Sequence, residues 1–593
     1  MTSPATKKYL DGLNKSLPHN YLYAMAGLVL TIYVLHSLGR LKRHVRHLAS
    51  LNGQSGAHRL FASTSPSIAW LKGHVLYAPM FKYRRATETR IGSRISLGSL
   101  PTRLQGLFLF FLVAFNVMAC VWQVPWSSPE LQVLPILRNR TGTLATANLI
   151  PICVLATIKN PLINALEISY DSFNLVHRWM GRLSILQGLA HTLCWMIAKV
   201  QKGGWTTVTA SFTHSSFIYT GLIATVGFTV IGLQSPKMFR SLAYEFFLHS
   251  HIILVAMAFA GLWIHLKQLP QQAMLLAAIL IWVVSRLWRL ATTIYRSCGH
   301  GGSKAVVVAL PSGAVKIQLF CARPWKVKNG QTLYLSIPSV GLWTAHPFSV
   351  AWGDTGSGLT GGDVDSVESN HGGLADDKIP IFAVREVGHT KETDGTIHLI
   401  VKRQTGFTRK LFEKAQEQRF SRVTLNAYIE GPYGHEKSMA SFGTVLLFAS
   451  GVGITHQMLY VKELVQGFAD GTVATQQITL VWVVPDAECL EWVRAWMSEI
   501  LGMEKRREVL KVFLYITRSS PVRGDFRSSA NVRICRGRPN VADIILAEAR
   551  ERTGAMAVSV CASGSLSDHV RQATRLAIGQ GVNASFAEEG FGW

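Results

Sequence analysis

The sequence predicts a multi-domain membrane protein, in which an all-α transmembrane bundle is followed by two domains built on β-sheets. Long apolar runs fill the first half of the 593-residue chain and almost vanish after Thr293, where short strand-like segments separated by turn residues take over. The chain is 48% hydrophobic and only 16% charged, which is typical of a membrane protein with a soluble part. We therefore expect units at 1–100, 101–295, 303–435 and 436–593.

Seven apolar segments predict about seven membrane helices. They cover Tyr21–Leu38, Gly106–Val124, Leu144–Ile158, His177–Val200, Ser216–Leu233, Phe246–Leu266 and Ala273–Ser285, of which the third and seventh are short. Lys and Arg are concentrated between the first and second segments, and Lys237 and Arg240 lie between the fifth and sixth. Both loops are therefore expected on the cytoplasmic side, with the N-terminus outside and everything after the seventh segment inside.

Two of these segments each contain two histidines that are 14 residues apart, His177 with His191 and His251 with His265. Fourteen residues make almost four helical turns, about 21 Å, so both members of a pair face nearly the same direction. On two neighbouring helices they would form an inner clamp, His177 with His251, and an outer clamp, His191 with His265. Such clamps can hold haem iron from both sides.

The alternative for each histidine is a hydrogen-bonded core residue, which is commoner in apolar helices, and only the repeated spacing within lipid favours the ligand role. His249 lies two residues before His251, on roughly the opposite face, and competes for that role. Arg178 and Arg182 share one helix face after the first ligand. They either pair with haem propionates or are ordinary positively charged flanking residues.

The net charge of +26 does not indicate a nucleic-acid partner, because much of it lies in juxtamembrane loops and no aromatic and basic nucleic-acid motif is present. Anionic lipid of the bilayer is the partner that this distribution favours. The eight cysteines show no metal-binding spacing, and a disulfide framework is not expected.

The third unit, 303–435, is typical of a small antiparallel barrel with a flexible insertion at 353–377. Its predicted strands are Ala305–Leu310, Val315–Leu319, Thr332–Ile337, Ile381–Val384 and Ile397–Val401. His346-Pro347-Phe348-Ser349 ends a strand, and Lys402 with Gly406-Phe407-Thr408 begins a helix, whose N–H groups can hold a pyrophosphate. Each motif alone fits a routine turn, whereas together, after a barrel pattern, they indicate a flavin site.

The last unit alternates strands and helices, which predicts an open parallel sheet. Its predicted strands are Thr444–Ala449, Ile478–Val484, Leu510–Ile516 and Ala557–Cys561. The first strand leads into a glycine loop containing Gly451, Gly453 and Thr455 and then a helix, the context that a dinucleotide site needs. Cys561 is either a neighbour of the nicotinamide or a buried structural thiol. Arg518 and Arg523 either meet a 2′-phosphate or belong to an ordinary polar loop.

Several of these motifs, in this order, resemble the fungal ferric reductase family, which belongs to a larger flavocytochrome group that includes the NADPH oxidases. The segment Asn174–Arg182 (NLVHRWMGR), the paired histidines, HPFS at 346–349, SGVGIT at 450–455 and FAEEGFGW at 586–593 carry the resemblance, which covers about residues 100–593. One departure is Cys561-Ala562-Ser563-Gly564, where the family usually has Cys-Gly-Pro.

The resemblance implies roles for particular residues. His346, Pro347, Phe348 and Ser349 would contact the flavin ring and ribityl chain of FAD, and Lys402, Gly406 and Thr408 would approach its pyrophosphate. Gly451, Gly453 and Thr455 would hold NADPH, with Cys561 near the nicotinamide. Trp593 would cover the flavin ring until nicotinamide displaces it.

The function so implied is that of a plasma-membrane ferric-chelate reductase that passes electrons from cytoplasmic NADPH, through FAD and two haem b groups, to extracellular ferric siderophores or chelates, or to cupric ions, for iron uptake. A permease or oxidase partner is left open. One alternative is an NADPH oxidase that produces superoxide, and another is a non-catalytic haem sensor. The outer loops, Gln201–Ser215 and Lys267–Gln272, are expected to be short and open, which favours a bulky ferric chelate as the acceptor.

Overall fold

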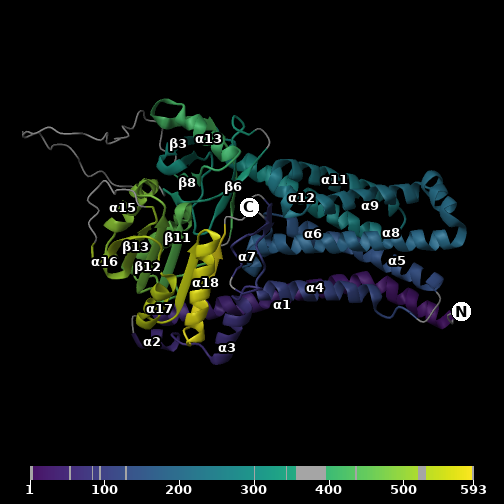
Figure 1. Cartoon of the computed structure of the whole chain (residues 1–593), viewed down its shortest axis with the longest axis horizontal. Coiled ribbons are helices and arrows are strands. Elements are labelled where there is room, and N and C mark those ends of the chain that lie inside the picture. Colours follow the sequence, from purple (N-terminus) through teal and green to yellow (C-terminus); the bar gives the residue numbers. More distant parts are fainter. Residues whose placement is uncertain are drawn as a thin grey trace, which may run out of the picture.

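The computed structural model describes residues 4–51, 55–82, 84–91, 95–126, 130–299, 301–341, 344–354, 395–434, 437–518 and 529–590. The molecule is elongated, with a helical bundle at one end and β-sheets at the other (Figure 1). The first helix begins at the end of the bundle far from the sheets, which we call the outer end. The end that adjoins the sheets is the inner end.

Six helices in the described part of the chain are long and apolar enough to cross a membrane. They are α1 (Pro4–Leu51), α4 (Arg103–Val121), α8 (Tyr170–His214), α9 (Ser216–Gln234), α11 (Tyr244–His265) and α12 (Gln271–Ser297). Shorter helices lie between them: α2 (Ser55–Leu60), α3 (Pro66–Leu71), α5 (Glu130–Ala147), α6 (Leu149–Ala156), α7 (Pro161–Leu166) and α10 (Lys237–Leu242). Six of the seven predicted segments thus lie in long apolar helices.

The third predicted segment, Leu144–Ile158, differs from the prediction because it is divided between α5 and α6. Proline has no N–H group, so Pro151 cannot donate to the carbonyl of Ala147, and the helix is interrupted at Asn148. The side chain of Asn148 accepts a hydrogen bond from Tyr21 (2.5 Å) and donates to Gln187 (2.8 Å). The break is therefore joined by polar contacts to α1 and α8, within a buried part of the bundle.

The outer loop predicted at Gln201–Ser215 is instead a helical continuation of α8. Gly203 and Gly204 leave helical geometry, and Gly204 has φ +69°, a conformation that favours glycine, so the helix bends there and resumes. The ring of Phe212 lies 5.5 Å from that of Trp195, so the segment folds back on the helix before the bend. The outer end is therefore covered by a helical turn-back, which we call the outer cap (residues 205–214).

Two antiparallel sheets follow the bundle. The first has the order β7 (Trp352–Gly353), β8 (Thr396–Lys402), β4 (Ala314–Phe320), β3 (Lys304–Leu310) and β9 (Arg422–Asn426), and the second has β10 (Tyr428–Tyr433), β5 (Thr332–Ser336) and β6 (His346–Ser349). Their inward side chains, such as Ile317 and Leu335, share one core with helix α13 (Phe407–Gln416). Four predicted strands are confirmed.

The fifth predicted strand, Ile381–Val384, lies outside the described residues, as does most of the insertion predicted at 353–377. The described start of that insertion is ordered by pairing: Gly353 belongs to β7, and Asp354 accepts a hydrogen bond of 2.8 Å from His398.

The last domain is a six-stranded parallel sheet, with the order β14 (Val532–Arg536), β13 (Leu510–Ile516), β12 (Gln477–Val484), β11 (Thr444–Ser450), β15 (Met556–Cys561) and β16 (Ala584–Glu589). Helices α14 (Ile454–Ala469), α15 (Arg494–Gly502), α16 (Arg506–Val509), α17 (Val541–Glu551) and α18 (Gly564–Gly579) connect and cover it. The strand order reverses between β11 and β15, and ligands of such sheets bind outside the carboxyl ends of the strands at that point.

The segment after α1 docks on this parallel-sheet domain, and we call residues 55–88 the strap. Thr64 N–H donates to the carbonyl of Gly581 (3.1 Å), and Lys72 donates to Asn583 (3.1 Å). Asp568, in the first turns of α18, accepts hydrogen bonds from the N–H groups of residues 85, 86 and 87. Part of the basic loop that the sequence assigned to lipid therefore contacts protein.

Candidate functional site

The outer pair of histidines, His191 on α8 and His265 on α11, meets inside the bundle. The two ring centroids are 6.2 Å apart, and the ring planes are nearly perpendicular, at 87°. Metal–imidazole bonds are about 2.0–2.1 Å long, so two nitrogens that share one metal ion lie about 4 Å apart. The separation of the two rings fits one metal ion between them.

Backbone carbonyls orient both outer rings. The Nδ1 atom of His191 lies 2.8 Å from the carbonyl oxygen of Arg138, and that of His265 lies 2.7 Å from the carbonyl oxygen of Phe217. Bonding Nδ1–H to a carbonyl fixes the tautomer and leaves Nε2 for a metal, as is usual for metal-bound histidines. Both hydrogen bonds run to helices that flank the site, α5 and α9.

Two glycines make these approaches possible, and the sequence analysis missed them. A Cβ atom on Gly142 would lie 2.5 Å from Nδ1 of His191, and one on Gly221 would lie 2.7 Å from Nδ1 of His265. Each glycine stands four residues after the residue whose carbonyl binds the ring. A glycine at this spacing opposite each histidine is a signal that only the packing of the helices reveals.

The inner pair is less symmetrical. The Nδ1 atom of His177 lies 3.0 Å from the carbonyl oxygen of Ile152, whereas Nδ1 of His251 is buried without a partner in the described structure. The ring of His251 instead lies 5.5 Å from that of Phe247. His249, the competing residue, is exposed on the other side of α11, with Nδ1 at 2.7 Å from its own helix carbonyl at Glu245.

These pairs fit haem better than a metal ion alone. Among the described residues no three His, Cys, Asp or Glu side chains come together to hold a metal. Each pair therefore offers two ligands, and a macrocycle would have to supply the others, as haem does.

A group of arginines at the inner end supports the same fit. Arg178 lies near Arg182 and Arg240, and the described structure shows no ion pair for these three. Burial lowers the pKa of Arg240, and its Nε atom has no partner in the described structure. Asp171 partly offsets the charge of Arg178, and the half-buried Arg240 still favours an anionic group such as a propionate at this position.

The two predicted flavin motifs lie next to each other. The ring of His346 stacks on Phe407 with centroids 4.3 Å apart, and Phe348 lies 6.3 Å from the same ring. Gly406 has φ +70° and precedes α13 with open space around it, so glycine serves the backbone conformation there. Thr408 accepts a hydrogen bond from the N–H of Gln404 (3.0 Å), which closes the turn.

The remaining members of the motifs surround this turn. Lys402 is exposed at the end of β8, and Pro347 and Ser349 lie half-buried on β6, in register with Tyr334 and Thr332 of β5. Burial lowers the pKa of His346, while Glu245 at the start of α11 acts in the opposite direction. The motif therefore adjoins the inner end of the helix that carries His251.

A salt bridge locks the sheets to the last membrane helix. Arg289 of α12 donates two hydrogen bonds, of 2.6 and 2.8 Å, to the carboxylate of Glu430 on β10. Tyr433 also donates to Glu430, and Ser297 accepts from the N–H of Ile429 at 2.8 Å. This bidentate pair gives the flavin-type unit a fixed place under the bundle.

The glycine loop of the parallel sheet has the geometry of a dinucleotide site. Gly451 has φ +54°, and a Cβ atom on Gly453 would lie 1.9 Å from the carbonyl oxygen of Cys561, so no larger residue fits there. The hydroxyl of Thr455 donates to the carbonyl of Val452 (2.8 Å), and the indole N–H of Trp482 donates to that of Gly451 (3.0 Å). The loop lies between β11 and β15, at the point where the strand order reverses.

Cys561 ends β15 beside this loop and is 2% exposed. Burial, with Glu589 as a further cause, raises the pKa of its thiol, which is therefore neutral at ordinary pH. Arg518, after β13, pairs with Asp486, after β12, at 3.2 Å, so both stand at the carboxyl ends of neighbouring strands. Arg523 and Trp593 lie outside the described residues.

Two family models match the chain. Residues 141–262 match the ferric reductase like transmembrane component, and residues 442–575 match the ferric reductase NAD binding domain. The first range contains His177, His191 and His251 and ends three residues before His265. The second contains the glycine loop. The fold and site thus define a multi-pass membrane protein with an NAD-binding oxidoreductase domain.

Curated proteins similar to this chain extend beyond the two matched regions. The chain is 26% identical over 521 residues to "Ferric/cupric reductase transmembrane component 2" of Saccharomyces cerevisiae, covering 81% of this chain and 65% of that protein. It is 28% identical to "Probable cell surface ferric reductase kap2" of Aspergillus oryzae, covering 73% of this chain and 54% of that protein. The chain thus spans less than two thirds of the length of these relatives. Its two matched regions are similar to the transmembrane component and the NAD binding domain of ferric reductases.

A solved structure, "Ferredoxin reductase in carbazole 1,9a-dioxygenase", is 14% identical with a TM-score of 0.30, and the match covers 48% of this chain and 68% of that one. The arrangement of an antiparallel pair of sheets before a parallel sheet is given by the strand pairing described above.

Proposed function

We propose that the protein is a transmembrane metalloreductase that moves electrons from cytoplasmic NADPH, through FAD and two haem b groups, to extracellular ferric chelates. The observation that carries the proposal is the meeting of His191 on α8 with His265 on α11, with His177 and His251 each 14 residues earlier on the same two helices. The similarity to ferric and cupric reductases supports metal as the acceptor.

Each group of residues has a distinct task in this proposal. Gly451, Gly453 and Thr455 hold the pyrophosphate of NADPH, and Cys561 borders the nicotinamide. His346-Pro347-Phe348-Ser349 and the Lys402–Thr408 turn hold FAD, which when bound converts a two-electron hydride into single electrons that haem iron can accept. The four paired histidines hold the haems, and the inner arginines neutralise propionates.

The sidedness follows from charge. The loops rich in Lys and Arg adjoin the inner end together with the strap and the sheets, so we place this end in the cytoplasm and the start of α1 outside. The plasma membrane is the membrane we propose, because the acceptor is extracellular. An electron leaving through the outer pair would then emerge under the outer cap.

The outer cap favours a second candidate, an oxidase that passes the electron to oxygen. Phe212 of the cap lies against Trp195, which stands one turn beyond His191, so the outer pair is less open than the sequence predicted. A covered haem edge admits a small acceptor more readily than a bulky chelate. Both candidates share the whole electron path and differ only at this surface.

The test compares the two acceptors in sealed vesicles that contain the full chain, with NADPH on the cytoplasmic side. Ferrous iron and superoxide formed outside are measured with superoxide dismutase present, so that superoxide cannot reduce the iron. We expect iron reduction that persists under dismutase and exceeds superoxide output. Iron reduction that collapses under dismutase would identify an oxidase, and no reduction of either acceptor would favour a non-catalytic sensor.

A further inference from the structure

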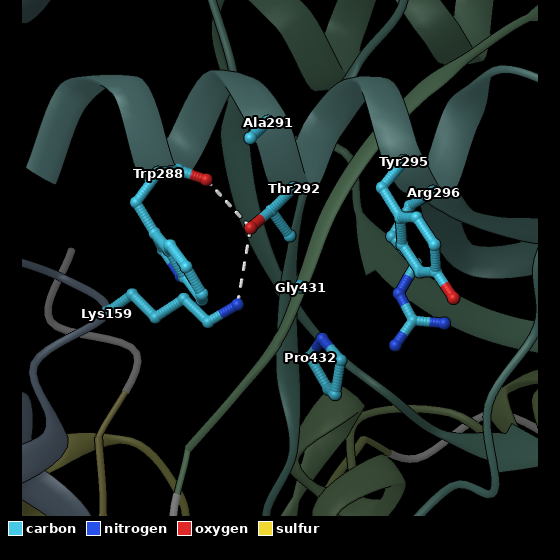
Figure 2. Close-up of a pocket in the computed structure, with 8 residues that line it drawn as sticks. All are labelled: Lys159, Trp288, Ala291, Thr292, Tyr295, Arg296, Gly431 and Pro432. Carbon is cyan, nitrogen blue, oxygen red and sulfur yellow. Dashed lines mark hydrogen bonds between the residues drawn. The ribbon is translucent and has the colours of Figure 1, made fainter. Parts of the chain in front are cut away.

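A pocket opens beside the inner end of α12, where this helix meets β10 (Figure 2). Its volume is about 290 Å³. It is lined by Lys159, from the turn after α6, by Trp288, Ala291, Thr292, Tyr295 and Arg296 of α12, and by Gly431 and Pro432 of β10. The pocket is separate from the histidine pairs and from the flavin motifs.

Two cations line the pocket, and none of its lining residues is acidic. Lys159 donates to the hydroxyl of Thr292 (3.2 Å), and Arg296 donates to the carbonyl of Arg323 (2.9 Å), so each contacts neutral groups. The neighbouring carboxylate of Glu430 is already engaged by Arg289. Burial and the nearby Arg296 lower the pKa of Lys159, while Glu430 acts in the opposite direction.

Aromatic rings mark the pocket as interfacial. The side chains of Trp288 and Tyr295 are 56% and 54% exposed on α12. The ammonium group of Lys159 lies 4.9 Å from the Trp288 ring, and the guanidinium group of Arg296 lies 5.4 Å from the Tyr295 ring. Trp and Tyr gather where a membrane helix leaves the hydrocarbon for the head-group layer.

The surface next to the pocket is apolar in the outward direction. Val284 and Leu287 are each 60% exposed and lie one turn from Trp288 and Ala291 on the same face of α12. A molecule held in the pocket by a negative group could therefore lay hydrocarbon along this face. A soluble anion has no hydrocarbon to place on that surface.

We propose that this pocket binds the phosphate group of an anionic phospholipid of the inner leaflet. The ammonium group of Lys159 and the guanidinium group of Arg296 face the head group from two sides of the pocket, the hydroxyl of Thr292 lies between them, and the acyl chains follow Val284 and Leu287 (Figure 2). Basic pockets at the cytoplasmic ends of membrane helices bind anionic head groups in this way. The proposal needs α12 to cross the membrane and, for the choice of leaflet, rests on the sidedness proposed above.

The position of the pocket gives this lipid a structural consequence. Three segments line it, and one of them, β10, carries Glu430 and Tyr433, which tie the sheets to Arg289 of α12. A bound lipid would add a contact across the same joint. It would thus help to hold the flavin-type unit against the bundle.

The test measures lipid retention by the full-length protein in nanodiscs of phosphatidylcholine, with or without phosphatidylserine. Lipids that stay on the protein are counted by native mass spectrometry. We expect the wild type to prefer phosphatidylserine, and K159Q with R296Q to weaken this preference roughly 30-fold, the loss expected for two basic residues at an anionic surface. K159R should retain it, and K267Q, in the turn between α11 and α12 at the outer end of α12, is the matched control.

Three outcomes would overturn the proposal. The double variant could retain phosphatidylserine as well as the wild type does, or K267Q could lose it equally. Inorganic phosphate, added to nanodiscs of phosphatidylcholine alone, could raise the melting temperature of the wild type as much as phosphatidylserine does and fail to do so for the double variant, which would identify a site for a soluble anion. The melting temperature and elution volume of each variant show whether it is folded.

Discussion

The inner and outer histidine pairs consist of the same residue type at the same spacing, yet they are held differently. Both outer rings bond a backbone carbonyl and rest against a glycine. At the inner pair His177 bonds a carbonyl, whereas Nδ1 of His251 has no partner in the described structure. Hydrogen bonds to the backbone therefore fix the direction of both outer rings. At the inner pair such a bond fixes His177 but not His251.

Histidines at equal spacing in a sequence therefore need not be equally well oriented in the structure. A ring oriented by a second hydrogen bond loses little freedom when it binds metal, because its tautomer and direction are already set. The inner pair, next to the flavin motifs, has one ring free to adjust.

Removing a ligand should have the largest effect. We expect H191L and H265L each to lose the outer haem, H177L and H251L each to lose the inner haem, and all four to abolish NADPH-driven reduction outside. The absorption spectrum of bound haem and the external reduction rate are the measurements. H249L should retain both, because His249 faces away from the pair. Loss of haem in H249L together with its retention in H251L would exchange the two roles.

Filling a glycine should affect the outer pair alone. In G142A and G221A the new Cβ atom would lie under 3.0 Å from the histidine ring, so that ring must leave its carbonyl. We expect haem affinity at the outer site to fall about 10–100-fold, the usual cost of losing an orienting partner, with the inner haem retained. Haem titration of each variant is the measurement. G188A, which has open space around the new atom, is the control, and equal loss in G188A would refute the explanation.

Detaching the strap should act on coupling between the domains. Asp568 accepts four hydrogen bonds from residues 85–87, and D568A would leave three half-buried N–H groups without this partner. We expect docking to weaken by about 1–3 kcal/mol, which lowers external reduction while NADPH still reduces a soluble dye at the flavin. D470A, on an exposed helix end, should change neither rate. A parallel loss of dye reduction would show that the strap maintains the NAD-binding domain itself.

The smallest effect concerns pH at the inner end. Burial lowers the pKa of His346, so below its ordinary value of 6.5 the unfolded chain binds more protons than the folded one. The free energy of unfolding should therefore be unaffected by His346 above about pH 6.5, and it should decrease as the pH falls from 6.5 towards the lowered pKa. We expect the melting temperature to drop by about 1–4 °C more between pH 7 and pH 5 in the wild type than in H346F. An equal drop in H346F would exclude His346 as the cause.

Much of the architecture could be predicted because lipid imposes a strong rule. In lipid the backbone polar groups must bond within a helix and the side chains that face lipid are apolar, so a long apolar run predicts a membrane helix. The rule fails at Leu144–Ile158, where Pro151 interrupts the helix and Asn148 is satisfied by Tyr21 and Gln187. It also fails at Gln201–Ser215, which is polar enough for a loop, yet Gly203 and Gly204 only bend a helix that continues beyond them.

The candidate site could be predicted where its residues are adjacent in the sequence. The strand, glycine loop and helix around Gly451 lie as expected, and His346 and Phe348 lie on the ring of Phe407. The partners of the histidines could not be predicted, because nothing in the sequence distinguishes the carbonyl or the glycine that contacts a histidine from the others. Nor was the strap, because its contacts join residues about 500 positions apart.

The strap also sets an order of events during synthesis. Lys72 bonds Asn583, which is 511 residues later in the chain. Ribosomes add about 5–20 residues per second, so the strap waits roughly 25–100 s for its partner after it leaves the ribosome. During that time its basic side chains and exposed N–H groups stand beside the membrane unpaired with the sheet. The contact of the strap with Asn583 and with β16 can therefore form only after more than 500 further residues have been made.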